Sequence, residues 1–172
     1  MDLYTRVFNQ ACFDVNEKVL TGFEKLGNDD FKVKTHLFNG RYENLYLDKE
    51  KIEGLDVIVD AANEEASKIL KVDKEKLVSG FWLNSMQPGD VTTAHTHDDD
   101  DEVLSCVYYI KVPTDTEKSG DLIISDKNER VVIPPKEGFF VFFSPSTLHE
   151  VTENESCEAR LSIAFNFGIK TG

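Results

Sequence analysis

The second half of the chain is a succession of short β-prone segments, and this feature constrains the fold most. The segments are rich in Val, Ile, Phe, Tyr and Trp and are separated by Gly, Pro, Asp and Asn, as expected for strands joined by turns. They cover residues 77–84, 91–97, 104–112, 121–125, 131–133, 139–143 and 161–167. Seven or eight short strands within about ninety residues predict a barrel or a double-sheet jelly roll, also called a double-stranded β-helix.

The first 75 residues follow a different pattern and predict helices. Apolar residues recur there every three or four positions in two segments, which places them on one face of each expected helix. The first stripe comprises Phe8, Cys12, Val15, Val19, Phe23 and Leu26, and the second comprises Leu55, Ile58, Val59, Ala62, Ala66, Ile69 and Leu70. Residues 32–47 are less periodic and are expected to form a short strand or an irregular crossing. We expect the helices to pack on the outer face of one sheet.

The chain has 172 residues, which is close to the usual size of one domain. No internal repeat or low-complexity linker divides it. We therefore predict a single domain over residues 1–172, of the α+β class and mainly β. In this prediction residues 1–75 form a helical flank, and residues 77–168 form a jelly-roll core.

The charge balance limits the partners of the protein. Asp and Glu number 32 against 19 Lys and Arg, so the formal net charge is −13. Such a chain is a poor ligand for nucleic acids and for anionic membranes, because both are bound through basic residues. The longest fully apolar run covers residues 139–143, far short of the ~20 residues that cross a bilayer. Three cysteines and no apolar leader segment predict a cytoplasmic protein.

Three of the four histidines lie in the β-rich half and suggest a metal site. His95 and His97 close an expected strand, where residues i and i+2 point to the same face. His149 follows about fifty residues later, near the end of another expected strand. Three protein ligands would leave coordination positions free for substrate and oxygen. His36 stands alone and is expected to be an ordinary surface or core histidine.

One resemblance is to the cupins, which are jelly-roll proteins with a His-x-His motif. Gly89, His95, His97 and Glu102 match the spacing of the first cupin motif, whereas the second motif, around His149, is poorly matched. This resemblance implies a metalloenzyme or isomerase that works without 2-oxoglutarate. A metal-stabilised binding module without enzymatic activity is a further alternative.

A second set of motifs resembles the iron(II)/2-oxoglutarate-dependent oxygenases, in particular small bacterial and phage members related to prolyl 4-hydroxylases. The order and spacing of the motifs carry this resemblance. They are Trp82-Leu83-Asn84, Pro88-Gly89, the run from Leu104 to Tyr109, Ser119-Gly120-Asp121-Leu122, Pro135 with Gly138, the run from Phe142 to Pro145 with His149, and the run from Arg160 to Asn166. The resemblance implies a dioxygenase that uses iron(II), 2-oxoglutarate as cosubstrate, and dioxygen to hydroxylate its substrate.

Arg160 favours the oxygenase over the cupin. It stands in an otherwise apolar segment, where an unpaired charge is costly, so it needs an anionic partner. A carboxylate suits a guanidinium well, because two parallel hydrogen bonds can form. The resemblance implies that Arg160 and Ser162 bind the distal carboxylate of 2-oxoglutarate with help from Tyr109. An ordinary salt bridge to one of the many acidic residues is the alternative for Arg160.

The identity of the metal ligands stays open at one position. Most such oxygenases use His-x-Asp and a distant His, whereas spacing from Gly89 favours His95 and His97 here, with His149 as the third ligand. Asp99 is an alternative to one of the first two, because His97-Asp98-Asp99 is itself a His-x-Asp sequence. We expect Asn84 to contact substrate. The acidic run at 98–102 favours a neutral or basic substrate, which could be a peptide or a small molecule.

Overall fold

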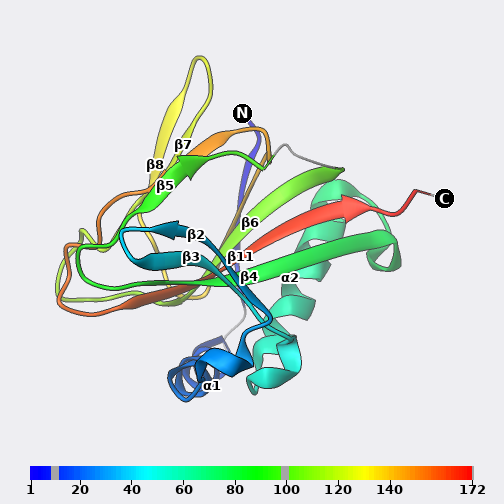
Figure 1. The fold of residues 1–172 in the computed structure, drawn as a ribbon. Coiled ribbons are helices and arrows are strands. Elements are labelled where there is room, and N and C mark those ends of the chain that lie inside the picture. Colours follow the sequence, from blue (N-terminus) through cyan, green and yellow to red (C-terminus); the bar gives the residue numbers. More distant parts are fainter. Residues whose placement is uncertain (9–11, 98–100, 172) are drawn as a thin grey trace.

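The structure is a computed structural model and describes residues 1–8, 12–97 and 101–171. Two antiparallel sheets face each other, and two helices cover the larger one, so that three layers are stacked (Figure 1). The seven-stranded sheet has the order β1 (Leu3–Val7), β9 (Phe139–Phe143), β6 (Glu102–Lys111), β11 (Arg160–Ile169), β4 (Leu77–Met86), β3 (Arg41–Tyr46) and β2 (Val33–Phe38). The four-stranded sheet has the order β5 (Thr92–His95), β10 (Leu148–Val151), β7 (Leu122–Ser125) and β8 (Arg130–Ile133).

The β-rich half forms the predicted double-stranded β-helix. Strands β4 to β11 all follow residue 76, and they divide equally between the two sheets. Sequence neighbours such as β4 and β5, or β9 and β10, lie in opposite sheets, which is how a jelly roll winds. The fold class and the jelly-roll architecture predicted from the sequence are therefore confirmed.

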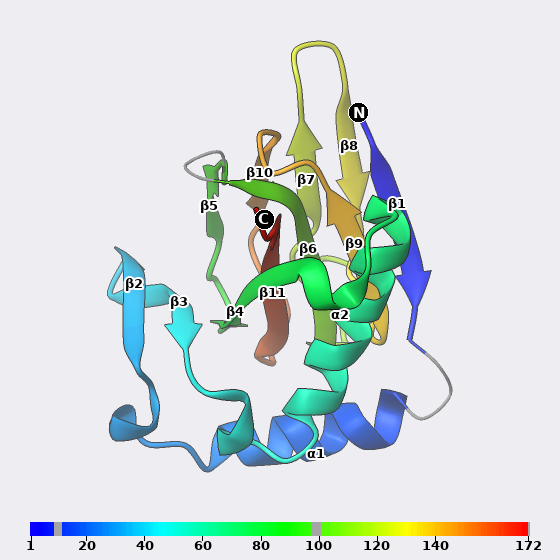
Figure 2. The same ribbon diagram turned by 90° about the vertical axis from the view of Figure 1, so that its right-hand side faces the viewer.

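The two helices bury their apolar stripes against the outer face of the seven-stranded sheet. Helix α1 (Cys12–Glu24) contacts β6, and α2 (Leu55–Leu70) contacts β4 (Figure 2). The main core lies between these helices and the sheet. It contains Leu55, Ile58 and Ala62 from α2, and Leu83, Tyr108, Phe140, Phe142, Ile163 and Phe165 from the strands. Each of the buried Leu, Ile and Phe side chains contributes roughly 1.5–3 kcal/mol by leaving water.

The prediction that residues 1–75 form a helical flank was incomplete, because β1 lies among them. The β2–β3 hairpin falls within residues 32–47, where a short strand or an irregular crossing was expected. Strand β1 pairs with β9, and the β2–β3 hairpin joins the sheet next to β4. Phe8, expected to begin the first helical stripe, precedes α1, and its N–H donates to the Gly138 carbonyl at 2.8 Å. These segments are strands because the edges of the jelly roll offer them backbone partners, which local periodicity does not reveal.

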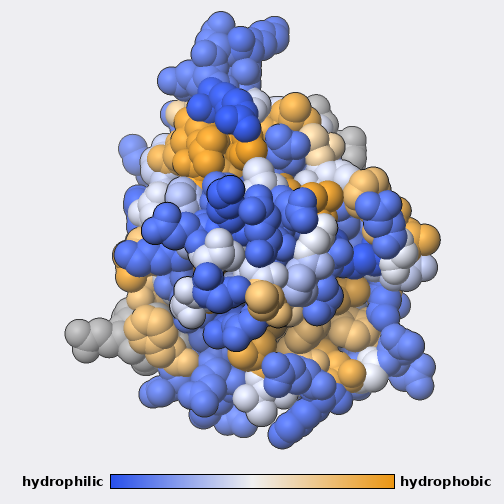
Figure 3. Space-filling model, turned by 90° about the vertical axis from the view of Figure 1, so that its left-hand side faces the viewer, coloured by the Kyte–Doolittle hydropathy of each residue, from blue (hydrophilic) through white to orange (hydrophobic). Residues whose placement is uncertain are grey.

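A smaller core fills one part of the space between the sheets. Tyr109, Leu122, Ile124, Val141 and Phe143 form it. The β7–β8 hairpin projects beyond this region, and its tip is a hydrophilic protrusion at one end of the molecule (Figure 3). Neither α-helix in the described part of the chain is long and apolar enough to span a membrane.

Candidate active site

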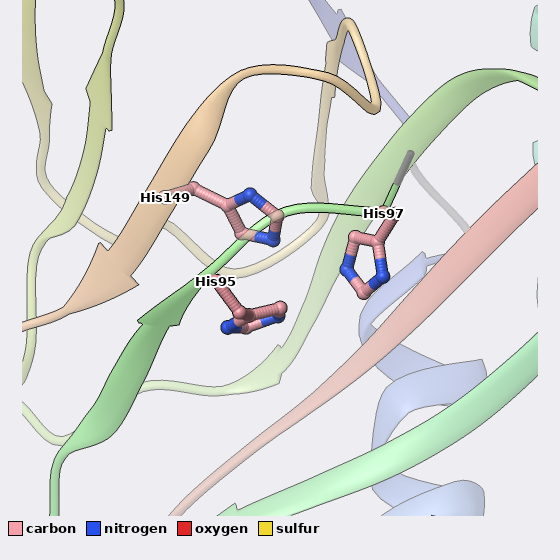
Figure 4. Close-up of side chains that lie close together, drawn as sticks. All are labelled: His95, His97 and His149. Atoms are coloured by element: carbon pink, nitrogen blue, oxygen red, sulfur yellow. The ribbon is translucent and has the colours of Figure 1, made fainter. Parts of the chain in front are cut away.

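Three histidines meet between the two sheets. One ring-nitrogen ligand atom from each of His95, His97 and His149 lies within 4.8 Å of the others, and their rings face a common point (Figure 4). His95 ends β5 and His149 is the second residue of β10, so His149 lies near the beginning of its strand rather than near the end as expected. The two strands are antiparallel and place these histidines opposite each other.

Backbone carbonyls hold two of the rings in one tautomer. His95 Nδ1 donates to the Thr93 carbonyl at 2.6 Å, and His149 Nδ1 donates to the Thr147 carbonyl at 3.0 Å. Both bonds run from a histidine to the residue two positions before it. Because Nδ1 carries the proton, Nε2 of each ring keeps its lone pair for a metal ion.

His97 reaches the cluster from a different backbone setting than predicted. Strand β5 ends at His95, so His97 lies just beyond the strand rather than on it. Its N–H donates to the Pro145 carbonyl at 2.8 Å, and its ring lies against Trp82 with a centroid distance of 5.3 Å. The prediction that His95 and His97 face one site is correct, but this bond to Pro145 replaces the strand as the support for His97.

The environment keeps two of the imidazoles neutral. Burial, reinforced by the neighbouring His95, lowers the pKa of His149 from 6.5 to about 3. Burial likewise lowers the pKa of His97 from 6.5 to about 4, with smaller contributions from His95 and His36. Neutral imidazole is the form that binds metals, so protons compete weakly for this site at neutral pH.

This donor set fits a first-row transition metal such as iron(II). Imidazole nitrogen suits iron, zinc, copper and nickel, and three protein ligands leave open coordination positions. The cluster differs from the common facial triad in having a third imidazole where that triad has a carboxylate. Asp99, the alternative ligand, lies outside the described residues.

A buried cavity adjoins the three histidines and contains the predicted cosubstrate residues. Arg160, Ser162 and Tyr109 all line it. Arg160 and Ser162 are two residues apart on β11 and share a face, as predicted, while Tyr109 lies opposite Ser162 on β6. All three side chains are almost fully buried. The cavity is therefore lined by three imidazoles on the side of the four-stranded sheet and by a guanidinium from the seven-stranded sheet.

Arg160 has unused hydrogen-bonding capacity in this cavity. Its Nη1 donates to the carbonyls of Ser119 and Gly120, its Cζ lies 5.4 Å from the centre of the Tyr109 ring, and its Nε has no hydrogen-bond partner. Among the described residues, no acidic side chain forms an ion pair with Arg160, so the salt-bridge alternative is not supported. Burial lowers the pKa of Arg160, and the nearby Tyr109 and Asp121 oppose this shift.

The Tyr109 hydroxyl is a second orphaned polar group. It is buried with no partner at hydrogen-bond geometry, and burial, partly opposed by the adjacent Arg160 guanidinium, raises the pKa of Tyr109 to about 12, so the hydroxyl remains protonated. A buried polar atom without a partner is costly and calls for an explanation. The guanidinium and the hydroxyl together fit an anionic oxygen ligand such as a carboxylate.

Asn84 lines the same cavity, but its amide is already engaged. Its oxygen accepts from Arg41 Nη2 at 3.1 Å, and its nitrogen donates to the Thr92 hydroxyl at 2.9 Å. This arrangement favours a structural role for Asn84 over the predicted substrate contact.

The β2–β3 hairpin brings His36 and Glu43 close to the site, although neither lines the histidine cavity; His36 is exposed, as expected for a surface histidine. The His36 ring lies 6.5 Å from the His95 ring, and His36 Nδ1 is within hydrogen-bond distance of the Asn44 side-chain nitrogen at 3.0 Å. His36 has a left-handed backbone with φ of 57°. Glu43, also on this hairpin, contacts the strand that carries His95. No motif or spacing marks these residues, because the hairpin reaches the site only through tertiary packing.

Glu102 does not join the histidine cluster among the described residues, which removes the ligand set of the cupin alternative. It lies at the start of β6 and, with Asp101, lines a second cavity that also contains Tyr46 and Trp82. Trp82 lines both cavities.

Comparisons with known proteins agree with this geometry. The family model described as the 2OG-Fe(II) oxygenase superfamily matches residues 81–168. A prolyl-4-hydroxylase from Pseudomonas putida has a similar structure, with 18% identity, coverage of 98% of this chain and 92% of that chain, and a TM-score of 0.74. Comparison with curated protein sequences finds no match.

Two further solved structures share the fold. A prolyl hydroxylase from Trichoplax adhaerens, in complex with a hypoxia inducible factor peptide fragment, is 13% identical; the alignment covers 97% of this chain and 83% of that chain, with a TM-score of 0.73. EvdO2 from Micromonospora carbonacea, complexed with 2-oxoglutarate, is 14% identical; the alignment covers 98% and 86% of the two chains, with a TM-score of 0.64.

Proposed function

The chain belongs to the 2OG-Fe(II) oxygenase superfamily, and on that premise we propose that His95, His97 and His149 hold its iron(II). Enzymes of this family use iron(II), 2-oxoglutarate and dioxygen, converting the cosubstrate to succinate and carbon dioxide while a C–H bond of the substrate is hydroxylated. The residues of this chain bind and orient the reactants and exclude water from the cavity.

We further propose that Arg160, Ser162 and Tyr109 bind the distal carboxylate of 2-oxoglutarate. Arg160 brings a buried positive charge, Tyr109 a protonated hydroxyl and Ser162 a second hydroxyl on the same wall. The 2-oxo acid end of the molecule would then lie toward the histidines on the opposite wall. A dicarboxylate thus satisfies both ends of the cavity.

One observation carries this proposal: a buried guanidinium with an unpartnered Nε lines the same cavity as three clustered imidazoles. A cupin-type enzyme that acts without 2-oxoglutarate has no use for such a cation. A binding module that needs a metal only for stability has no use for it either.

We propose that the substrate is neutral or basic and is a peptide or a small molecule. The net charge of −13 disfavours anionic substrates on approach. Asp101 and Glu102 line the second cavity, which meets the histidine site at Trp82. The similar protein from Trichoplax adhaerens holds a peptide fragment, which supports testing peptides first.

The test is turnover of 2-oxoglutarate to succinate with iron(II) and ascorbate, in the wild type and in Arg160→Ala. We expect the wild type to form succinate. In Arg160→Ala the affinity for 2-oxoglutarate should fall about 30-fold or more, which corresponds to roughly 2–5 kcal/mol. Arg130→Ala is the matched control, because Arg130 is exposed on β8 and does not line the cavity.

Binding of 2-oxoglutarate is measured separately by calorimetry, so that a loss of affinity is distinguished from a loss of turnover alone. Wild-type protein that binds metal but neither binds nor consumes 2-oxoglutarate would overturn the proposal and favour the metal-stabilised binding module.

A further inference from the structure

Strand β5, which carries His95, is weakly supported by backbone pairing. It lies at the edge of the four-stranded sheet, and within the described part of the chain it pairs only with β10. Two residue pairs make up this ladder, His149 with His95 and Val151 with Thr92, and the register shifts between them. A metal ligand must be held in a narrow range of positions, so β5 needs support from its other side.

Glu43 provides that support from the seven-stranded sheet. Its Oε1 accepts from the Thr93 N–H at 2.9 Å, and its Oε2 accepts from the Thr93 hydroxyl at 3.0 Å. Glu43 lies on β3 and is only 2% exposed. A carboxylate therefore occupies the place where a neighbouring strand would offer a carbonyl, and it binds the backbone and the side chain of a single residue.

Thr93 in turn holds His95. The carbonyl of Thr93 accepts from His95 Nδ1 at 2.6 Å, which sets the tautomer and orientation of the ring. A continuous chain of hydrogen bonds thus connects the Glu43 carboxylate, through Thr93, to the His95 imidazole. The N–H of Thr93 faces Glu43, and its carbonyl faces His95, so the two bonds together restrain the backbone on both sides of this residue.

His149 is also oriented by an anchored threonine, but a local turn provides the anchor. His149 Nδ1 donates to the Thr147 carbonyl, and the Thr147 N–H donates to the Ser144 carbonyl at 3.1 Å within a tight turn. In both cases a threonine two residues before the histidine is anchored through its own N–H. A local turn supplies the anchor for Thr147, whereas Thr93 depends on a residue fifty positions earlier in the chain.

We propose that Glu43 is a positioning residue for the iron site, which restrains Thr93 so that His95 presents Nε2 to the metal. This inference rests on the proposed function, because it takes His95 as a metal ligand. Glu43 touches neither metal nor cosubstrate in this arrangement and acts through Thr93 alone. Its buried charge is partly offset by Arg41, which lies on the same strand and experiences its electrostatic attraction.

Cobalt(II) is the probe for the test, because it replaces iron(II) in such sites and its visible absorption reports ligand geometry. We expect Glu43→Ala to weaken Co(II) binding by about 10- to 100-fold, the usual effect of removing a partner of a metal ligand. Glu43→Gln keeps an oxygen acceptor for the Thr93 N–H and should recover most of the affinity. The Co(II) spectrum of Glu43→Ala should also differ from that of the wild type.

Glu137→Ala is the matched control. Glu137 likewise accepts from a backbone N–H, that of Val112 at 2.9 Å, but it does not line the histidine cavity. We expect Glu137→Ala to lose stability without changing Co(II) affinity or the Co(II) spectrum. If Glu43→Ala does not fold, Glu43→Gln and Thr93→Val provide the comparison; Thr93→Val removes only the hydroxyl. Each should lose less Co(II) affinity than expected for Glu43→Ala, but more than Glu137→Ala.

Nuclear magnetic resonance provides a readout that does not depend on a loaded metal. The His95 Nδ1–H signal in metal-free protein should shift or exchange faster with water in Glu43→Ala, and should be unchanged in Glu137→Ala. Unchanged Co(II) affinity and unchanged His95 signals in folded Glu43→Ala would overturn this inference alone. Failure of the wild type to bind Co(II) would instead overturn the metal site and, with it, the proposed function.

Discussion

His95 and His149 lie opposite each other in the antiparallel pairing of β5 and β10, with their ring centroids 4.3 Å apart. Opposed residues of two paired strands move together, so this pairing fixes the relative placement of the two imidazoles. His97 completes the cluster from the segment after β5. The four-stranded sheet thus sets the relative position of two of the three imidazoles, and the segment that follows β5 supplies the third.

Removal of His149 is predicted to abolish metal binding. His149→Ala leaves two imidazoles, and we expect the loss in Co(II) or iron(II) affinity to exceed the roughly 10- to 100-fold typical of an indirect partner. His97→Asp should retain metal, because it creates two imidazoles and one carboxylate, a set that iron(II) favours. Metal content after dialysis measures both effects. Full occupancy in folded His149→Ala would show that the metal binds elsewhere.

Acidification is predicted to destabilise the metal-free protein well above pH 4. The folded-state pKa values of His149 and His97, about 3 and about 4, lie below the ordinary value of 6.5, so the unfolded chain binds more protons below pH 6.5. Stability is therefore lost as the pH falls from 6.5 toward those values. The slope is at most about 1.4 kcal/mol per pH unit for each histidine, and less for the partly exposed His97.

Urea unfolding of metal-free protein between pH 7 and pH 5 measures this slope. The double variant His97→Gln/His149→Gln is the control, and its stability should depend less on pH across the same range. Equal pH dependence in the two proteins would contradict the prediction.

Gly120→Ala is predicted to impair cosubstrate binding while sparing the metal. A Cβ on Gly120 would lie 2.6 Å from Arg160 Nη1, so the guanidinium must move. We expect at least a tenfold loss of 2-oxoglutarate affinity, equivalent to about 1.4 kcal/mol, with unchanged Co(II) affinity. Gly40→Ala is the matched control, because Gly40 also has a positive φ, at +77°, but no atom lies within 4 Å of its added Cβ.

The adjacent tyrosines are predicted to respond oppositely to loss of their hydroxyls. Tyr109→Phe removes a buried hydroxyl without a partner, so the free energy of unfolding should be unchanged or should rise, while 2-oxoglutarate affinity falls. Tyr108→Phe breaks a 2.7 Å bond to Asn16 in the helix-side core and should cost about 1–3 kcal/mol of stability. Denaturant unfolding and calorimetry distinguish the two; a normal affinity in Tyr109→Phe would exclude its hydroxyl from the cosubstrate site.

Sequence reasoning succeeded where the chemistry depends on short spacing or on an unusual residue in its context. The His-x-His pair, the distant His149 and the charge of Arg160 within an apolar segment all indicated groups that the structure brings to one cavity. The short runs of β-branched and aromatic residues, separated by turn residues, likewise indicated strands after residue 76. Such signals lie within short stretches of sequence, so a single sequence is enough to recognise them.

The remaining features depend on contacts between distant segments. Strand β1 and the pairing of the β2–β3 hairpin with β4 depend on the edges of the large sheet, and Glu43 meets Thr93 only after the two sheets have packed. His36 itself has a left-handed backbone, and its ring lies near that of His95; no periodicity in the sequence indicates this contact. Side-chain contacts across the sandwich were therefore beyond what spacing could predict.

The two walls of the cavity belong to different sheets: the histidines come with β5 and β10, and Arg160 with β11. Facing sheets are held at a nearly constant separation, about 10 Å, by the side chains packed between them. If 2-oxoglutarate binds as proposed, the separation of the sheets fixes the distance that the cosubstrate must span. A 2-oxo diacid of another chain length, with four or six carbons, would then contact either the histidines or Arg160 in good geometry, but not both.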